Sequence, residues 1–304
     1  MARSETSVLT AGARLVWQHK RIPCWLFIIN AMLALVSIIP ITPWLRSVLD
    51  HSVYSERLSR SFDVNALTEL LYRSDSLLLS AQLNGVLPSL AFLVIALFMT
   101  GGILAKYLSA ESLSTSGFFG ACGSFFCRLG RLLILFVVFL GVFLCILSPF
   151  FHMATNLMDS PNRQALGFWA TMGTTALLVV ALMAVRLWFD MTQLRAVAHN
   201  ERSMLRCFKG SFPITFGNFG TLFWMYLRIS ILNWLVIGTG ALLWIHVPAK
   251  RWGLTLALWE AVAFLGIVAR LWQRAGETIW YQRYLAVVGS LILAPRFRLR
   301  PTLS

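Results

Sequence analysis

Six long apolar runs constrain the fold of this chain more than any other feature of its sequence. A helix needs roughly 20 apolar residues to cross a bilayer core of about 30 Å. Backbone N–H and C=O groups find no water inside hydrocarbon, so each run is expected to be a helix. We place the spans at about 24–45, 84–105, 132–152, 166–188, 221–246 and 252–272. The sequence therefore predicts an all-α membrane protein, with residues 1–304 forming a single integral membrane domain.

The distribution of charge favours a membrane over nucleic acid as the partner of this chain. Only 12% of the residues are charged, whereas soluble domains have about 25%. The net charge of +14 comes from Lys and Arg that lie next to the apolar runs, not from a separate basic domain. Basic residues at such positions contact anionic lipid headgroups. We therefore expect membrane lipids as partners, including anionic headgroups on the cytoplasmic side, and no nucleic acid.

The positions of Lys and Arg also predict the orientation of the spans. The spans form three consecutive pairs. The N-terminal segment, the two loops between pairs and the C-terminal segment hold 18 Lys and Arg residues, and the three loops within pairs hold 7. Cytoplasmic segments carry this excess, so we expect a multi-pass protein of a bacterial inner membrane with both termini in the cytoplasm. Residues 275–304 then form a basic cytoplasmic tail. The loop at 46–81 lies outside, where a surface helix would cover the bundle or bind a protein partner.

A short amphipathic stretch precedes the first, third and fifth spans. These stretches, which we call elbows, cover residues 8–22, 116–131 and 203–219. Their apolar and basic faces are typical of helices that lie in the plane of the membrane interface. Each elbow is expected to break from its span at Pro23, at Gly130 and at residues 217–220, respectively.

The second span of each pair ends in a basic residue followed within two positions by an aromatic one. The basic residues are Lys106, Arg186 and Arg270, and the last two belong to identical Arg-Leu-Trp triplets. We expect the charge to anchor among headgroups and the Trp to lie in the interfacial aromatic belt. We call this basic and aromatic end of the second span the exit. The elbow, the break and the exit recur in the same order, so the chain is predicted to contain three elbow-helix-helix repeats.

This layout resembles a family. The stretches GARLVWQHKRIPCWLFIIN, GSFFCRLGRLLILFVV and GSFPITFGNFGTLFWMY, with the two RLW exits, are similar in layout to uncharacterised bacterial membrane proteins. They also resemble the membrane region of membrane-anchored glycerophosphodiester phosphodiesterases. The soluble catalytic domain of that family has no counterpart here, because the longest hydrophilic segment is the loop at 46–81. Phosphodiesterase activity is therefore not expected.

The sequence gives little support for a catalytic activity. The common nucleophile, phosphate-binding, zinc-protease and dinucleotide motifs are absent. His51, His152 and His246 could supply metal ligands only if three unrelated loops converged, and no C-x-x-C pair exists among the five cysteines. We therefore expect no catalytic residues, no metal, no cofactor and no enzymatic activity. A lipid-modifying enzyme is disfavoured because carboxylates and histidines do not cluster.

Two charged residues lie inside predicted spans. Arg228 is in the fifth span and Glu260 is in the sixth. A charge inside the bilayer costs about 2.5–3.5 kcal/mol on insertion scales, which makes these residues candidates for a substrate-binding site. Their predicted depths differ by about 7 Å at 1.5 Å per residue, a distance that an ion pair could bridge. Alternatively, Arg228 extends to the headgroups and Glu260 is protonated or hydrogen-bonded.

Two classes of function remain open. The first is a non-enzymatic scaffold or subunit in envelope or lipid-related processes. The alternative is a transporter of a small solute or lipid that uses Arg228 and Glu260. The spans contain few polar residues, which disfavours a hydrophilic cavity and therefore favours the scaffold.

Overall fold

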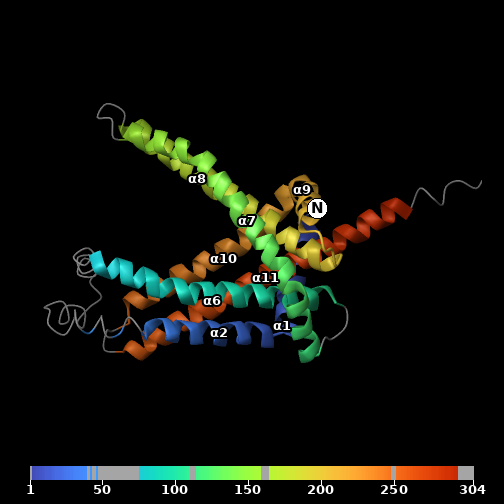
Figure 1. Cartoon of the computed structure of the whole chain (residues 1–304), viewed down its shortest axis with the longest axis horizontal. Coiled ribbons are helices and arrows are strands. Elements are labelled where there is room, and N and C mark those ends of the chain that lie inside the picture. Colours follow the sequence, from blue (N-terminus) through green and yellow to red (C-terminus); the bar gives the residue numbers. More distant parts are fainter. Residues whose placement is uncertain are drawn as a thin grey trace, which may run out of the picture. The chain divides into compact units, whose positions relative to one another are not determined.

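The computed structural model describes residues 2–39, 42, 46, 75–109, 114–158, 164–247 and 251–293. Across these ranges the regular secondary structure is entirely helical, which confirms the all-α prediction (Figure 1). The helices are α1 (Ala2–Gln18), α2 (Arg21–Ile38), α6 (Asp75–Leu108), α7 (Thr115–Met158), α8 (Gln164–Ala198), α9 (Met204–Gly217), α10 (Phe219–Ile245) and α11 (Trp252–Leu293).

Six of these helices are long and apolar enough to cross a membrane. They are α2, α6, α7, α8, α10 and α11, and each overlaps one predicted span. The prediction of a six-span membrane protein is therefore confirmed. Some of these helices extend well beyond the apolar runs, since α7 has 44 residues and α11 continues to Leu293.

The breaks between elbows and spans agree with the sequence at two of three places. A turn at His19 and Lys20 separates α1 from α2 and puts Pro23 in the first turn of α2, where a proline fits. Asn218 alone separates α9 from α10. The predicted break at Gly130 is wrong, because α7 runs through this residue without interruption. A transmembrane helix tolerates glycine, so Gly130 does not end it. The threefold repeat stays a prediction.

The chain divides into two compact units, which are described separately. The first contains residues 1–8, 98–227 and 276–304, and the second contains residues 9–97 and 228–275. In the first unit, α7 packs along α8 to form a long hairpin, and α9 packs against α8 (Figure 1). The rings of Phe136 on α7 and Phe189 on α8 stack with centroids 4.3 Å apart.

In the second unit, α10 and α11 form an antiparallel hairpin. Trp244 lies against Trp259, with ring centroids 5.9 Å apart. Asn233 Oδ1 is 3.6 Å from the place that a Cβ at residue 266 would occupy. The side chain of Val262 fills the space where Gly240 lacks one. These contacts fix the register of the hairpin.

Most of the spanning surface is apolar and exposed, as expected for contact with lipid. In the apolar windows of α7, α8 and α11, only 6% of the residues are buried within the protein. Trp169 on α8 is 71% exposed. The end of α8 differs, because residues 185–197 are buried almost without exception. The densest packing of this helix therefore lies beyond its most apolar part.

The structure describes only part of the two hydrophilic segments that the sequence predicts. Of the loop at 46–81, positions 47–74 lie outside the described residues, and α6 already begins at Asp75. Of the tail at 275–304, the first part belongs to α11 and residues 294–304 lie outside the described residues.

Candidate functional site at the junction of α8 and α9

A hydrogen-bonded seam joins the end of α8 to α9. Trp188 Nε1–H donates to the backbone oxygen of Phe208 at 3.0 Å and to Ser211 Oγ at 3.1 Å. Thr192 Oγ1 lies 2.5 Å from Ser211 Oγ, and its hydroxyl also donates to the backbone oxygen of Trp188. One turn further along α9, the Thr215 hydroxyl donates to the backbone oxygen of Ser211. We call these five residues the Trp188 seam.

The seam is buried and tightly packed. Thr192, Ser211 and Thr215 are at most 1% exposed, and Trp188 is 8% exposed. The Trp188 ring stacks on the ring of Phe208 with centroids 4.0 Å apart. A buried hydroxyl or indole N–H is costly unless it is hydrogen-bonded, and here each has a partner. The indole N–H of Trp188 therefore bonds to a neighbouring helix, and a place of this residue in the interfacial belt stays a prediction.

The second Arg-Leu-Trp triplet makes a corresponding contact. Trp272 Nε1–H donates to the backbone oxygen of Leu9 on α1 at 2.7 Å. Each Trp of the two triplets therefore donates to a backbone carbonyl of an elbow helix. Trp188 bonds to the third elbow and Trp272 to the first.

The first exit contacts the second elbow through glycines instead of a Trp. A Cβ at residue 101 of α6 would lie 2.9 Å from Phe125 Cβ on α7. A Cβ at residue 102 would overlap Cys122 Sγ and lie 3.0 Å from the backbone oxygen of Phe118. Only glycine allows this approach of α6 to α7. Each exit thus packs on the elbow that comes next in the chain, the third exit returning to the first elbow.

Beyond the seam, a charged cluster connects the same two helices. Arg195 on α8 lies 3.6 Å from Glu201 Oε1, and the Cys207 thiol on α9 donates to Glu201 Oε2 at 3.2 Å. Burial raises the pKa of the Cys207 thiol to about 12, and the hydrogen bond and the negative charge of Glu201 act in the same direction. Cys207 is therefore a neutral donor at physiological pH, not a nucleophile.

An open hollow of about 520 Å³ adjoins this cluster. It is lined by Arg195, Leu205, Arg206, Lys209 and Gly210, and we call it the basic hollow. The Arg195 guanidinium lies against Gly210, at the place where any other residue would have its Cβ. The hollow therefore combines three cations with one exposed apolar side chain.

Further polar residues are buried near the ends of α8 and α11 in the first unit. Asp190 and Glu277 are each 2% exposed, and Thr278 is fully buried. His199 Nε2 lies 3.0 Å from the Tyr281 hydroxyl. Sequence reasoning missed Glu277, Thr278 and Tyr281, because they follow the last apolar run and were assigned to the tail. Tyr281 follows Glu277 by four residues and Thr278 by three, which places it on the same helix face as this adjacent pair, and this spacing is the signal that could have found them.

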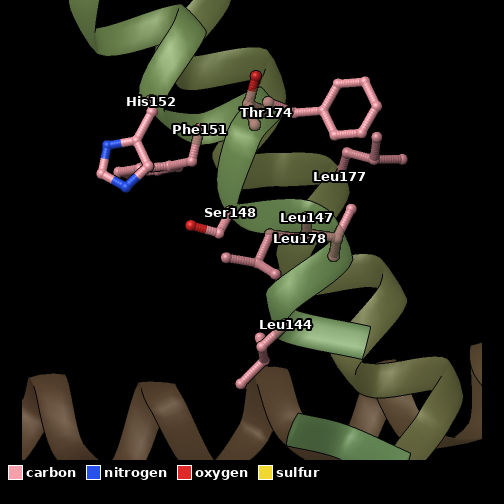
Figure 2. A pocket seen from close by; sticks show the side chains of 9 residues that line it. Leu144, Leu147, Ser148, Phe151, His152, Thr174, Leu177 and Leu178 are labelled. Carbon is pink, nitrogen blue, oxygen red and sulfur yellow. The ribbon is translucent and has the colours of Figure 1, made fainter. Parts of the chain in front are cut away.

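An apolar groove of about 400 Å³ runs along the α7–α8 hairpin (Figure 2). Its lining residues are Leu144, Leu147, Ser148, Phe150, Phe151, His152, Thr174, Leu177 and Leu178. The Thr174 hydroxyl is bonded to the backbone oxygen of Ala170 at 2.7 Å. Six of the nine lining residues are apolar, so the groove is mainly hydrophobic and suits lipid chains better than a polar solute.

The predicted site residues Arg228 and Glu260 are both partly exposed and lie on α10 and α11. Neither lines the basic hollow or the apolar groove. The contacts of Asn233 with Gly266 and of Gly240 with Val262 set the hairpin register. If the same pairing of positions is continued along both helices, Glu260 lies beside a position about 14 residues after Arg228. At 1.5 Å per residue, the two side chains are about 20 Å apart along the helix axes. This separation disfavours a direct ion pair.

Among the described residues, no group of three or more His, Cys, Asp or Glu side chains could hold a metal ion. His51, one of the three histidines considered above, lies outside those residues. In comparisons with known protein families, curated proteins and solved structures, nothing matches this chain. The resemblance to the membrane region of glycerophosphodiester phosphodiesterases therefore stays an expectation.

Proposed function

We propose that this chain is a non-enzymatic scaffold or subunit of the bacterial inner membrane that acts in envelope or lipid-related processes through its cytoplasmic interface. The observation that carries the proposal is the Trp188 seam. Buried, fully bonded polar groups hold an elbow helix rigidly against the end of a spanning helix. A fixed elbow presents a constant surface to lipids or to a partner.

The exposed face of α9 suits a membrane interface. Leu205, Phe212 and Phe216 are 57%, 47% and 39% exposed, although they are large and apolar. Arg206 and Lys209 on the same helix are exposed as well. A helix that combines exposed apolar and basic side chains is stabilised by acyl chains and anionic headgroups together. These exposed side chains support a position of α9 at the cytoplasmic surface of the bilayer.

The residue-level support for the alternative function, transport of a small solute or lipid, is the pair of charges at Arg228 and Glu260. Transport requires a cavity at mid-depth that opens alternately to the two sides of the membrane. The hairpin register keeps these two residues apart. The polar groups of the Trp188 seam are closed to solvent. The scaffold is therefore the better-supported function.

Thiol accessibility separates the two functions. A variant with Cys24→Ser, Cys127→Ser and Cys145→Ser retains only Cys122 and Cys207, which are both fully buried. In membranes, a scaffold should leave both thiols unlabelled by N-ethylmaleimide, with or without an ion gradient. A variant that also retains the exposed Cys127 serves as the positive control. Labelling of Cys207 that appears only under a gradient would support transport instead.

The predicted orientation needs its own test. Reporter fusions after Arg60 and Asp159 should give an outer-side signal, and fusions after Ser112 and Arg202 a cytoplasmic one, because Lys and Arg are concentrated on the cytoplasmic side. A cytoplasmic signal after Arg60 would contradict the six-span topology.

A further inference from the structure

We propose that the basic hollow is a binding site for a phosphate group. The hollow lies between the end of α8 and the first half of α9. Its volume of about 520 Å³ is within the range of roughly 300–1,000 Å³ that is typical of ligand sites. The inference rests on the proposed function in one respect, which is that α9 lies at a lipid surface.

The charge around the hollow is unbalanced. Three cations line it, namely Arg195, Arg206 and Lys209, and no carboxylate belongs to its lining. Glu201 is the acidic group paired with Arg195, but its oxygen is 3.6 Å from the guanidinium, which is too long for a hydrogen bond. The other oxygen of Glu201 already accepts a bond from the thiol of Cys207. The hollow therefore keeps a net positive charge and unused N–H donors.

The guanidinium of Arg195 is held in place for an anion. Its Nε is buried and has no hydrogen-bond partner among the described residues. The side chain as a whole keeps 22% of its surface exposed, so an anion in the hollow can contact the guanidinium, whose positive charge Nε leaves without a bonded acceptor. A Cβ at residue 210 would overlap the guanidinium, lying 2.5 Å from Arg195 Cζ. The absence of a side chain at Gly210 therefore allows Arg195 to occupy its position.

The N–H donors that line the hollow match a phosphate group. Two guanidinium groups offer planar pairs of N–H donors, which match the oxygens of a phosphate, and an ammonium adds a third cation. Leu205 lines the same hollow and is 57% exposed. An apolar side chain next to a phosphate site fits an anionic phospholipid, whose acyl chains would continue past Leu205. A soluble phosphate compound would use the same cations without this contact.

The test compares lipid binding by the full chain and by four variants in neutral detergent, with native mass spectrometry as the readout. Phosphatidylglycerol is the probe, phosphatidylcholine is the zwitterionic control, and inorganic phosphate is the competitor. The double variant Arg206→Gln/Lys209→Gln should weaken phosphatidylglycerol binding about 30-fold, at roughly fivefold per cation. The matched control for charge is Arg202→Gln, an exposed arginine outside the lining.

A second pair of variants tests the geometry without changing the charge. Gly210→Ala should weaken phosphatidylglycerol binding at least tenfold, because the new Cβ displaces the guanidinium of Arg195. Gly217→Ala on the same helix meets no atom within 4 Å and should bind as the wild type does. Thermal melting of every variant confirms that it is folded, and the charge variants decide the question if Gly210→Ala does not fold.

The outcomes are distinct. Selective losses in the double variant and in Gly210→Ala support the site. Competition by inorganic phosphate would show that free phosphate can also occupy it, whereas lipid binding without competition would assign it to a lipid headgroup. Wild-type binding by both variants, or an equal loss in Arg202→Gln, overturns the proposal. In that case the protection of Cys207 from alkylation would still stand, so the scaffold function is tested separately.

Discussion

Replacing Trp188 by Phe tests whether the Arg-Leu-Trp triplet is a structural joint or a membrane-belt residue. The change removes the indole N–H that bonds to the Phe208 carbonyl and to Ser211 Oγ. One buried hydrogen-bonding group is worth about 1 kcal/mol. The smaller ring also leaves space next to Phe208, which costs about 1–2 kcal/mol more. We therefore expect the free energy of unfolding to fall by about 2–3 kcal/mol in total.

Thermal unfolding in detergent, followed by intrinsic fluorescence, measures this loss. At about 2 °C per kcal/mol, the expected decrease in Tm is about 5 °C. Trp169→Phe is the matched control, because Trp169 lies on the same helix and is 71% exposed. Its Tm should change by at most about 1 °C. Equal shifts in the two variants would refute the argument, since both residues would then act as membrane-belt aromatics.

Three further predictions follow from contacts described above. Gly102→Ala should lower the free energy of unfolding by about 1–3 kcal/mol in thermal melts, because its Cβ would overlap the Cys122 sulfur, whereas Gly173→Ala points into open space and should have almost no effect. Thiolate absorbance from Cys207 in the folded protein should still be rising above pH 9, because the pKa of this thiol is about 12; complete ionisation of all five thiols near pH 9 would contradict this pKa. Since the thiol pKa is raised in the folded state, its contribution to stability is present below pH 9 and is lost as the pH rises towards 12. In a double-mutant cycle, Arg228→Leu and Glu260→Leu should lower stability additively within about 0.5 kcal/mol, and a larger coupling would show that they interact.

The spans were predictable because the requirement for a helix inside hydrocarbon is local. Each apolar run is itself sufficient to indicate a helix, and each appears in the structure. The start of α2 near Pro23 was predictable for a similar reason, since proline fits the first turn of a helix. The break at Gly130 was not, because the effect of a glycine depends on what surrounds it. The neighbouring Leu129 and Leu132 are fully buried, and this packing favours a continuous helix through Gly130.

The candidate site was much less predictable, since it depends on contacts between distant residues. The triplet around Trp188 was recognised in the sequence, but the acceptors of its indole N–H lie 20 and 23 residues away on another helix. The buried carboxylate of Glu277 belongs to the stretch that was predicted as a basic cytoplasmic tail after the last span. The role of Gly210 is visible only when the position of Arg195 is known.

The hydrogen bond from Trp272 to the Leu9 carbonyl joins residues 263 positions apart and has a consequence for how the protein is made. A ribosome adds about 5–20 residues per second, so α1 emerges about 13–50 s before the Trp272 side chain exists. During this interval the amphipathic α1 has no Trp272 to bind and depends on lipid or a chaperone to shield its apolar face. A chain that stops before α11 never acquires this bond. Its exposed first helix would mark it as incomplete to the proteases that survey newly inserted membrane proteins.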